Sequence, residues 1–224
     1  MRPREPSDRE ESAAAVDRIL RQRTDRPDPA MKPSSRLAQQ LASDQFGPLF
    51  VWPQHDDTVA RIWSKLGMHT LEEVIEDRDA SPRGRFVAAE ILFSNELAFL
   101  DRHDHKMIAA LYARALAERA TGSADPWGLL WIDDSIDPLG SRFLALGDAA
   151  IPALRELLRN DTVVDWYAGS EQASVGNAAR YRIKDFAAFY LARIVGIQLA
   201  AHAEPAERDG EIARLTAALD ARAR

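Results

Sequence analysis

The residues best able to do chemistry form a short cluster, Asp101-Arg102-His103-Asp104-His105. Imidazole nitrogens and carboxylate oxygens bind divalent cations, and a bound cation can polarise a phosphate or activate a water molecule. Adjacent residues on one helix point about 100° apart, however, so a single helix cannot direct all of these side chains at one ion. We therefore interpret the cluster as a solvated helix start with Asp104 as its N-cap.

The adjacent pair His103-Asp104 also resembles the dyad of the HD-type phosphohydrolases. That resemblance implies a further histidine and a further aspartate, distant in sequence, around a divalent metal. His69 and Asp165 are candidates for these positions, but nothing in their spacing selects them. A metal-dependent phosphohydrolase centred on His103 and Asp104 is therefore the alternative to a non-catalytic function.

Other catalytic signatures are missing from the sequence. The chain has no cysteine, which excludes disulfides, thiolate catalysis and cysteine-ligated zinc. It has no phosphate-binding loop, no dinucleotide fingerprint and no His-Glu-x-x-His motif. Gly169-Ser170 lacks the flanking glycine pattern of a nucleophile elbow. We expect no enzyme activity and no cofactor.

Composition limits the partners. The 224 residues are 46% hydrophobic and 29% charged, with a formal net charge of -6. An acidic chain is poorly suited to bind nucleic acid over a broad face, because phosphate binding needs clustered positive charge. No secretory signal follows Met1, and no segment approaches the roughly 18 apolar residues of a membrane span. We expect a cytoplasmic protein that binds neither nucleic acid nor membrane.

A long polar loop is the best candidate for a binding surface. Residues 165–172 read Asp-Trp-Tyr-Ala-Gly-Ser-Glu-Gln, and long loops on a rigid scaffold commonly carry binding sites. Tryptophan and tyrosine supply much interface energy at low entropy cost. Alternatively, these two aromatic residues anchor the loop to the core. The residues predicted to contact another protein are Trp166, Tyr167, Glu171 and Trp131.

The chain divides into an N-terminal segment and a helical body. Residues 1–55 are predicted to be a flexible or loosely docked arm and strap, with a short helix at 36–42. The arm could order on a partner or support a homo-oligomer. Residues 56–224 are predicted to form one helical domain, with irregular insertions at 122–138 and 160–181.

Helical periodicity and cap signals place the elements of the body. A capping box, Thr70 to Glu73, predicts a helix start, and Asp148 is the expected N-cap of another helix. A β-hairpin remains possible within 162–180. The predicted helices cover about 56–67, 70–75, 82–93, 104–120, 139–146, 148–159, 182–195 and 205–221.

Two acidic residues lie within strongly apolar helices. Glu90 and Asp185 are expected to be buried, and a buried carboxylate needs a cation or several donors. Arg83, Arg182 or Lys184 could supply that cation, so we predict structural ion pairs rather than acid–base catalysis.

The sequence contains an internal repeat. Leu66-Gly67 and Leu146-Gly147 each precede an apolar helix, and each helix is followed by a loop and a helix with paired alanines. The matching segments are Leu71-x-x-Val74-Ile75-x-Asp77 with Leu154-x-x-Leu157-Leu158-x-Asn160, and Ala88-Ala89-x-x-Leu92 with Ala187-Ala188-x-x-Leu191.

These residues resemble the HEAT-repeat family, best over 139–196 and less closely over 58–93. The resemblance implies an all-α fold, a short α-solenoid of about four stacked helix pairs preceded by the N-terminal arm. It also implies binding rather than catalysis. The predicted function is a non-catalytic protein–protein interaction module, which acts as a scaffold, an adaptor or an inhibitor of immunity-protein type.

Overall fold

The computed structural model describes residues 30–43, 56–122, 124–128, 138–164, 171–200 and 202–222, and the secondary structure of these residues is helical. The predicted all-α class is therefore confirmed, whereas the stacking of helix pairs into a solenoid remains a prediction. The chain forms two compact units, Met1–Arg102 and His103–Arg224. Predictions about residues 1–29 and 44–55 fall outside the described residues. No helix in the described part is long and apolar enough to cross a membrane.

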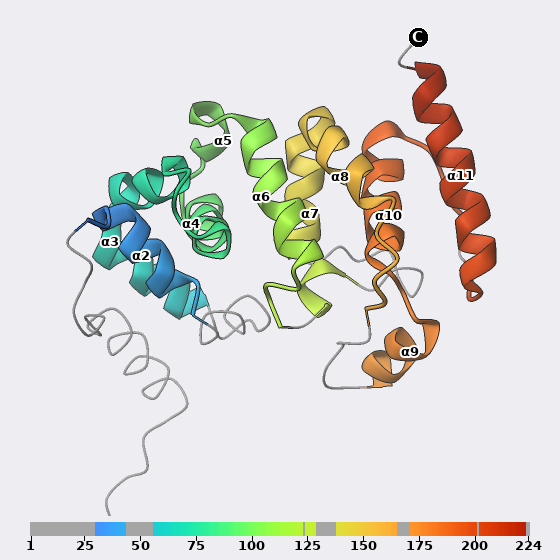
Figure 1. Ribbon diagram of the computed structural model, residues 1–224, viewed down its shortest axis with the longest axis horizontal. Helices are drawn as coiled ribbons and strands as arrows, with labels where there is room; N and C mark the ends of the chain where they lie inside the picture. Colours follow the sequence, from blue (N-terminus) through green and yellow to red (C-terminus); the bar gives the residue numbers. More distant parts are fainter. Residues whose placement is uncertain are drawn as a thin grey trace, which may run out of the picture. The chain divides into compact units, whose positions relative to one another are not determined.

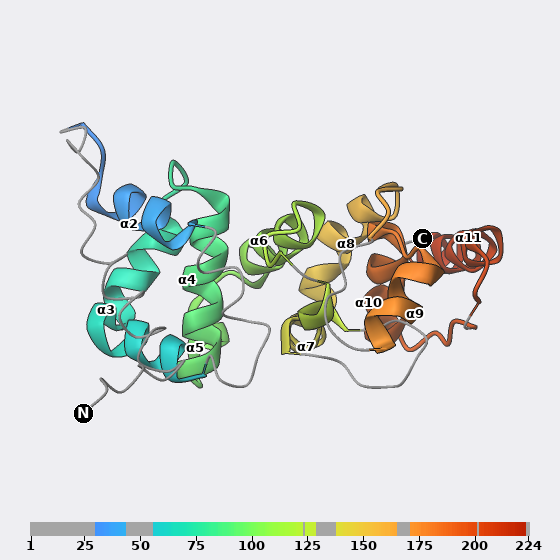
Figure 2. The same ribbon diagram turned by 90° about the horizontal axis from the view of Figure 1, so that it is seen from below.

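The first unit is built from α2 (Pro33–Leu41), α3 (Asp56–Glu76), α4 (Pro82–Asn95) and α5 (Phe99–Arg102). Figures 1 and 2 show α2 lying across the α3–α4 pair, and α2 contacts both helices. Ser81 caps α4 as predicted, because its side chain accepts a hydrogen bond from the Gly84 amide. The core of this unit is apolar and includes Leu41, Ile62, Leu71, Val74, Phe86, Ala88, Ala89 and Leu92.

A glycine permits the close packing of α2 on α4. A Cβ atom built on Gly84 would lie 2.0 Å from the carbonyl oxygen of Ala38, a distance that no real contact allows. Ala38 is itself fully buried. Residues 30–43 therefore belong to the packed body of the first unit.

A buried carboxylate holds the start of α2 against the turn between α3 and α4. Asp77 Oδ2 accepts hydrogen bonds from Ser35 Oγ at 2.6 Å and Ser34 Oγ at 2.8 Å. Lys32 Nζ lies 3.4 Å from Asp77 Oδ1 and 2.9 Å from Asp79 Oδ2. The two serine hydroxyls lower the pKa of Asp77 to about 2, because they stabilise its charged form.

The second unit contains six α-helices among its described residues. These are α6 (His105–Ala117), α7 (Pro138–Leu146), α8 (Ile151–Leu157), α9 (Glu171–Ala179), α10 (Ile183–Val195) and α11 (Pro205–Arg222), with 3-10 turns η3 (Asp125–Trp127) and η4 (Gly147–Ala150). Figure 1 shows α7 and α8 between α6 and α10, and α11 beyond α10. Buried aromatic rings join these helices, with Phe143 5.2 Å from Tyr190 and 5.9 Å from Trp127.

The internal repeat predicted from the sequence has a geometric counterpart. Gly67 interrupts α3 with a φ of 72°, and Gly147 follows α7 with a φ of 56°, a region that favours glycine. After the next helix, Asp77 Oδ1 accepts a hydrogen bond from the Asp79 amide at 3.1 Å. Asn160 Oδ1 accepts one from the Thr162 amide at 3.0 Å. Each unit thus contains a glycine kink, a helix, the same side-chain turn and an alanine-rich helix.

Three local predictions are wrong. The Thr70–Glu73 capping box does not start a helix, because α3 is helical again directly after Gly67. Asp148 is not an N-cap, since Gly147 directs the chain into the 3-10 turn η4 before α8 begins. The possible hairpin within 162–180 is replaced by α9, and the only bridge among the described residues joins Val163 and Arg182.

Replacement of Gly84 by alanine should destabilise the protein, by about 1–3 kcal/mol, because α2 or α4 must move to admit the methyl group. Gly210 is the matched control. It lies exposed in α11 with no atom within 4 Å of the added Cβ, so Gly210→Ala should stabilise by up to about 1 kcal/mol. Urea denaturation measures both changes. Equal effects of the two substitutions would contradict the proposed close contact.

The Asp77 cluster predicts a pH dependence of stability. The folded-state pKa of about 2 lies below the ordinary value of 3.8, so the carboxylate stabilises the fold above pH 3.8. That contribution decreases as the pH falls and is lost as the pH passes through about 2. The denaturation midpoint of the wild type should therefore exceed that of Asp77→Asn at pH 7, and the gap should close towards pH 2. Asp79 is exposed, so the denaturation midpoint of Asp79→Asn should differ little from that of the wild type at every pH.

Candidate binding site at the base of the 160–182 excursion

The chain leaves the helical body after α8 and returns at α10, and we call residues 160–182 the excursion. Its two ends are joined by backbone hydrogen bonds. The amide of Val164 donates to Tyr181 O at 2.5 Å, Ile183 N to Thr162 O at 3.0 Å and Lys184 N to Asn160 O at 3.0 Å. The excursion is therefore closed at its base, where both ends of the chain have fixed positions.

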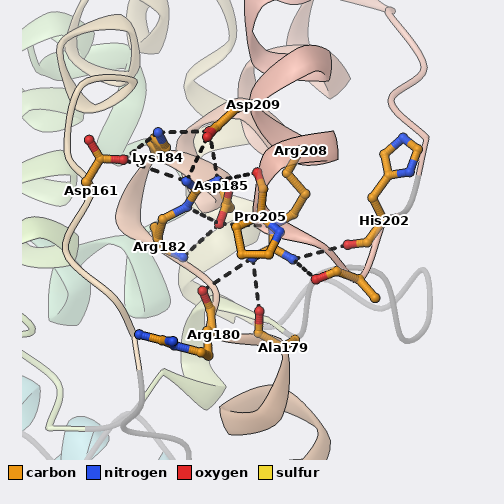
Figure 3. A network of polar contacts seen from close by, with 11 residues as sticks. Asp161, Ala179, Arg180, Arg182, Lys184, Asp185, His202, Pro205, Arg208 and Asp209 are labelled. Atoms are coloured by element: carbon orange, nitrogen blue, oxygen red, sulfur yellow. Dashed lines mark hydrogen bonds and ion pairs between the residues drawn. The ribbon is translucent and has the colours of Figure 1, made fainter.

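A buried carboxylate lies at the centre of this base (Figure 3). The Asp185 side chain has 0% exposure and accepts hydrogen bonds from the Arg182 amide at 2.8 Å and from Arg182 Nε at 3.1 Å. Arg182 Nη2 adds a third bond at 2.9 Å. This arrangement caps the start of α10 and confirms the ion pair predicted for Asp185, with Arg182 as the cation among the three candidates. The other predicted carboxylate, Glu90, is buried and accepts a hydrogen bond from Ser94 Oγ.

A second arginine reaches Asp185 from α11. The Arg208 side chain is 1% exposed and its Nε lies 3.2 Å from Asp185 Oδ2. Its Nη1 donates to the carbonyls of His202 at 3.2 Å and Ala203 at 2.5 Å. Its Nη2 donates to the carbonyls of Ala179 at 3.0 Å and Arg180 at 3.3 Å. All five N–H donors of this guanidinium therefore have an acceptor.

An outer ring of charge surrounds the buried pair. Lys184 Nζ is paired with Asp161 and lies 2.8 Å from Asp209 Oδ1, which is also 2.9 Å from Arg182 Nη2. Burial opposes the charged form of Lys184, but hydrogen bonds to Asp161 and Asp209 outweigh it and raise the pKa. Three cations (Arg182, Lys184 and Arg208) thus face three anions (Asp161, Asp185 and Asp209), and the cluster is electrically balanced.

Tyr181 closes the inner side of the cluster. Its ring lies 5.0 Å from the guanidinium carbon of Arg208, within the range of a cation–π contact. Burial raises the pKa of the Tyr181 hydroxyl to about 12, although the positive charge of Arg208 opposes that shift. Tyr181 therefore stays neutral over the physiological pH range, and its hydroxyl is no candidate for a base.

The other predicted insertion is also anchored where it leaves the body. Trp127 is fully buried, and its carbonyl accepts a hydrogen bond from the Tyr190 hydroxyl. The indole nitrogen of Trp127 donates to Thr121 Oγ1 at 3.3 Å. The Trp127 side chain of this insertion is thus packed within the second unit.

Of the four residues predicted to contact another protein, the structure describes the backbone of Glu171. Trp131, Trp166 and Tyr167 fall outside the described residues. Glu171 is the first residue of α9, but its side chain is not described. The structure thus describes the two ends of the excursion, and the role of Trp166 and Tyr167 in partner contact stays a prediction.

The cluster at 101–105 forms a helix start. Asp104 is the N-cap of α6, since its Oδ1 accepts a hydrogen bond from the Lys106 amide at 2.9 Å. This confirms the N-cap interpretation. Throughout the described part of the chain, no three His, Asp or Glu side chains are grouped so that they could hold a metal ion.

Sequence reasoning overlooked Arg208, which joins α10, the end of α9 and the linker before α11. One signal could have revealed it. Arg208 precedes Ile212, Leu215 and Leu219 at spacings of 4, 7 and 11, so it lies on the apolar stripe of α11. An arginine on such a stripe must be paired when buried.

Comparison of the chain with protein-family models, curated proteins and solved structures gives no match. The conclusions therefore rest on this geometry. The cluster offers a fixed, charge-balanced base whose arginine donors are already bound within the protein, and such a base can position a loop.

The central carboxylate should be far more important for stability than the peripheral ones. Asp185→Asn removes the carboxylate that pairs with the buried Arg208 and leaves Arg182 with its more exposed partner Asp209, so it should destabilise the protein by about 3–5 kcal/mol. Asp161→Asn, at a side chain with 71% exposure, should cost less than about 1 kcal/mol. Chemical denaturation of the two variants tests this, and a similar loss in both would argue against a dominant buried pair.

Proposed function

We propose that this protein is a non-catalytic interaction module that binds another protein through the 160–182 excursion. One observation carries the proposal: the excursion is closed at its base by three backbone hydrogen bonds and by the Asp185 cluster. A segment whose two ends are held on so rigid a base loses less conformational freedom on binding, which favours affinity. The contact surface includes Trp166, Tyr167, Glu171 and Trp131, where aromatic side chains anchor the partner within a charged rim.

The repeated motif supports the same proposal. The motif consists of a glycine kink, a helix, a side-chain turn and an alanine-rich helix, and it occurs twice. Such repetition is typical of a HEAT-like stack of helix pairs. Repeat scaffolds of this kind present binding loops on a rigid body, and scaffold, adaptor and inhibitor roles all use such a surface. This step is an analogy between folds, and the loop carries the specific claim.

The test is capture of a partner by the full-length protein and by the double variant Trp166→Ala/Tyr167→Ala. Loss of two aromatic anchors should weaken binding by about 2 kcal/mol or more, roughly 30-fold in Kd. Mass spectrometry identifies the captured protein, and titration with that purified protein gives the affinity.

Leu97→Ala is the matched control, because Leu97 is the exposed large apolar side chain of the described residues and lies in the first unit. It should bind as the wild type does. Equal affinity of the wild type and the double variant for the captured protein would disprove the loop as the contact surface. Thermal unfolding of each variant verifies that the fold is retained.

A further inference from the structure

Arg208 connects three segments that are distant in sequence. It belongs to α11, and its five donors reach Asp185 of α10, the end of α9 and the linker before α11. Because the guanidinium is planar and rigid, all these groups must be in place together for every bond to form. The position of the end of α9 is therefore tied to the docking of α11.

The end of α9 has a strained backbone. Arg180, the residue after α9, has a φ of 50°, in the left-handed region that a side chain disfavours. The carbonyls of Ala179 and Arg180 accept the two bonds from Arg208 Nη2. These bonds stabilise the strained conformation, so we expect the turn to relax when Arg208 is withdrawn.

The cap of α10 and the backbone hydrogen bonds of the base are made without Arg208. Arg182 donates three hydrogen bonds to Asp185, and the backbone bonds between the two ends of the excursion involve neither Arg208 nor α11. Withdrawal of Arg208 should thus release α9 while the start of α10 keeps its cap. The end of α9 can therefore become disordered while the start of α10 stays ordered, so that Arg208 affects one element and not the other.

We propose that α11 controls the order of α9 through Arg208, and that docking of α11 thereby regulates the partner-binding excursion. The control of α9 stands by itself, whereas its regulatory role rests on the proposed function. By thermodynamic reciprocity, a protein bound to the excursion also strengthens the docking of α11, and release of α11 weakens that binding.

Hydrogen exchange of the intact chain, read by mass spectrometry, tests the control of α9. In Arg208→Met, amides of 171–180 should exchange about tenfold faster or more, while those of α6 and α8 keep their wild-type rates. Arg208→Lys should not restore protection, because its single nitrogen cannot reach both pairs of carbonyls. Arg214→Met is the control: this exposed arginine of α11 bonds Gln198 O and Glu211, and its loss should leave α9 unchanged.

A second pair of variants tests whether the docking of α11, and not only the loss of the Arg208 side chain next to α9, controls the order of α9. Leu219 is buried near the far end of α11, and Leu219→Ala should loosen α11 without touching α9. Amides of 171–180 should then exchange faster together with those of α11. Leu116→Ala, which truncates a buried side chain in α6, is the control, and it should not accelerate exchange selectively in 171–180 and α11. If Leu219→Ala makes the amides of α11 exchange faster but leaves those of α9 at their wild-type rates, the proposal is overturned. This result is decisive even if Arg208→Met fails to fold.

The partner-binding measurements then distinguish this inference from the proposed function. Coupled exchange of α9 and α11 supports the control of α9 whether or not Trp166→Ala/Tyr167→Ala loses a partner. If the double variant loses the partner but Leu219→Ala binds it with wild-type affinity, the excursion is the contact surface and regulation by α11 is refuted.

Discussion

The charge of Asp185 is the constraint on which the second unit depends. A carboxylate with no exposure loses its hydration, and that loss is tolerated only when charged donors replace the water. Arg182 supplies three bonds from the start of α10 and Arg208 supplies one from α11. Satisfying one buried anion therefore fixes the entry into α10, the docking of α11 and the end of the excursion.

Much of the helical fold could be predicted because its signals are local. Ser81-Pro82 places the start of α4, and the apolar stripe beginning at Ile183 places α10. The prediction failed at α9, which has no apolar stripe and whose middle, Ser-Val-Gly-Asn, consists of poor helix formers. It also failed at Gly147, where a positive φ changes how the following helix begins. In both places the surrounding structure, and not the local pattern, decides the backbone conformation.

The candidate site was predictable in part for the same reason. Asp185 and Arg182 are neighbours on one helix turn, so their pairing follows from spacing alone. The bonds of Arg208 to Ala179 and Arg180 depend on how α11 docks, which no local pattern encodes. Likewise, the contact of Ser34 and Ser35 with Asp77 forms only after α2 packs on α4.

The two copies of the repeated motif differ in the length of chain that each must close. The first copy turns from α3 into α4 over residues 77–81, whereas the second closes the whole of 160–182 between α8 and α10. A loop roughly four times longer has a closure entropy penalty about 1 kcal/mol greater. Three backbone bonds and a buried ion cluster at this junction offset that penalty. The hydrogen bonds and ion pairs at this junction thus allow the second copy of the motif to contain a long insertion. Its helices still pack on one another, as those of the first copy do.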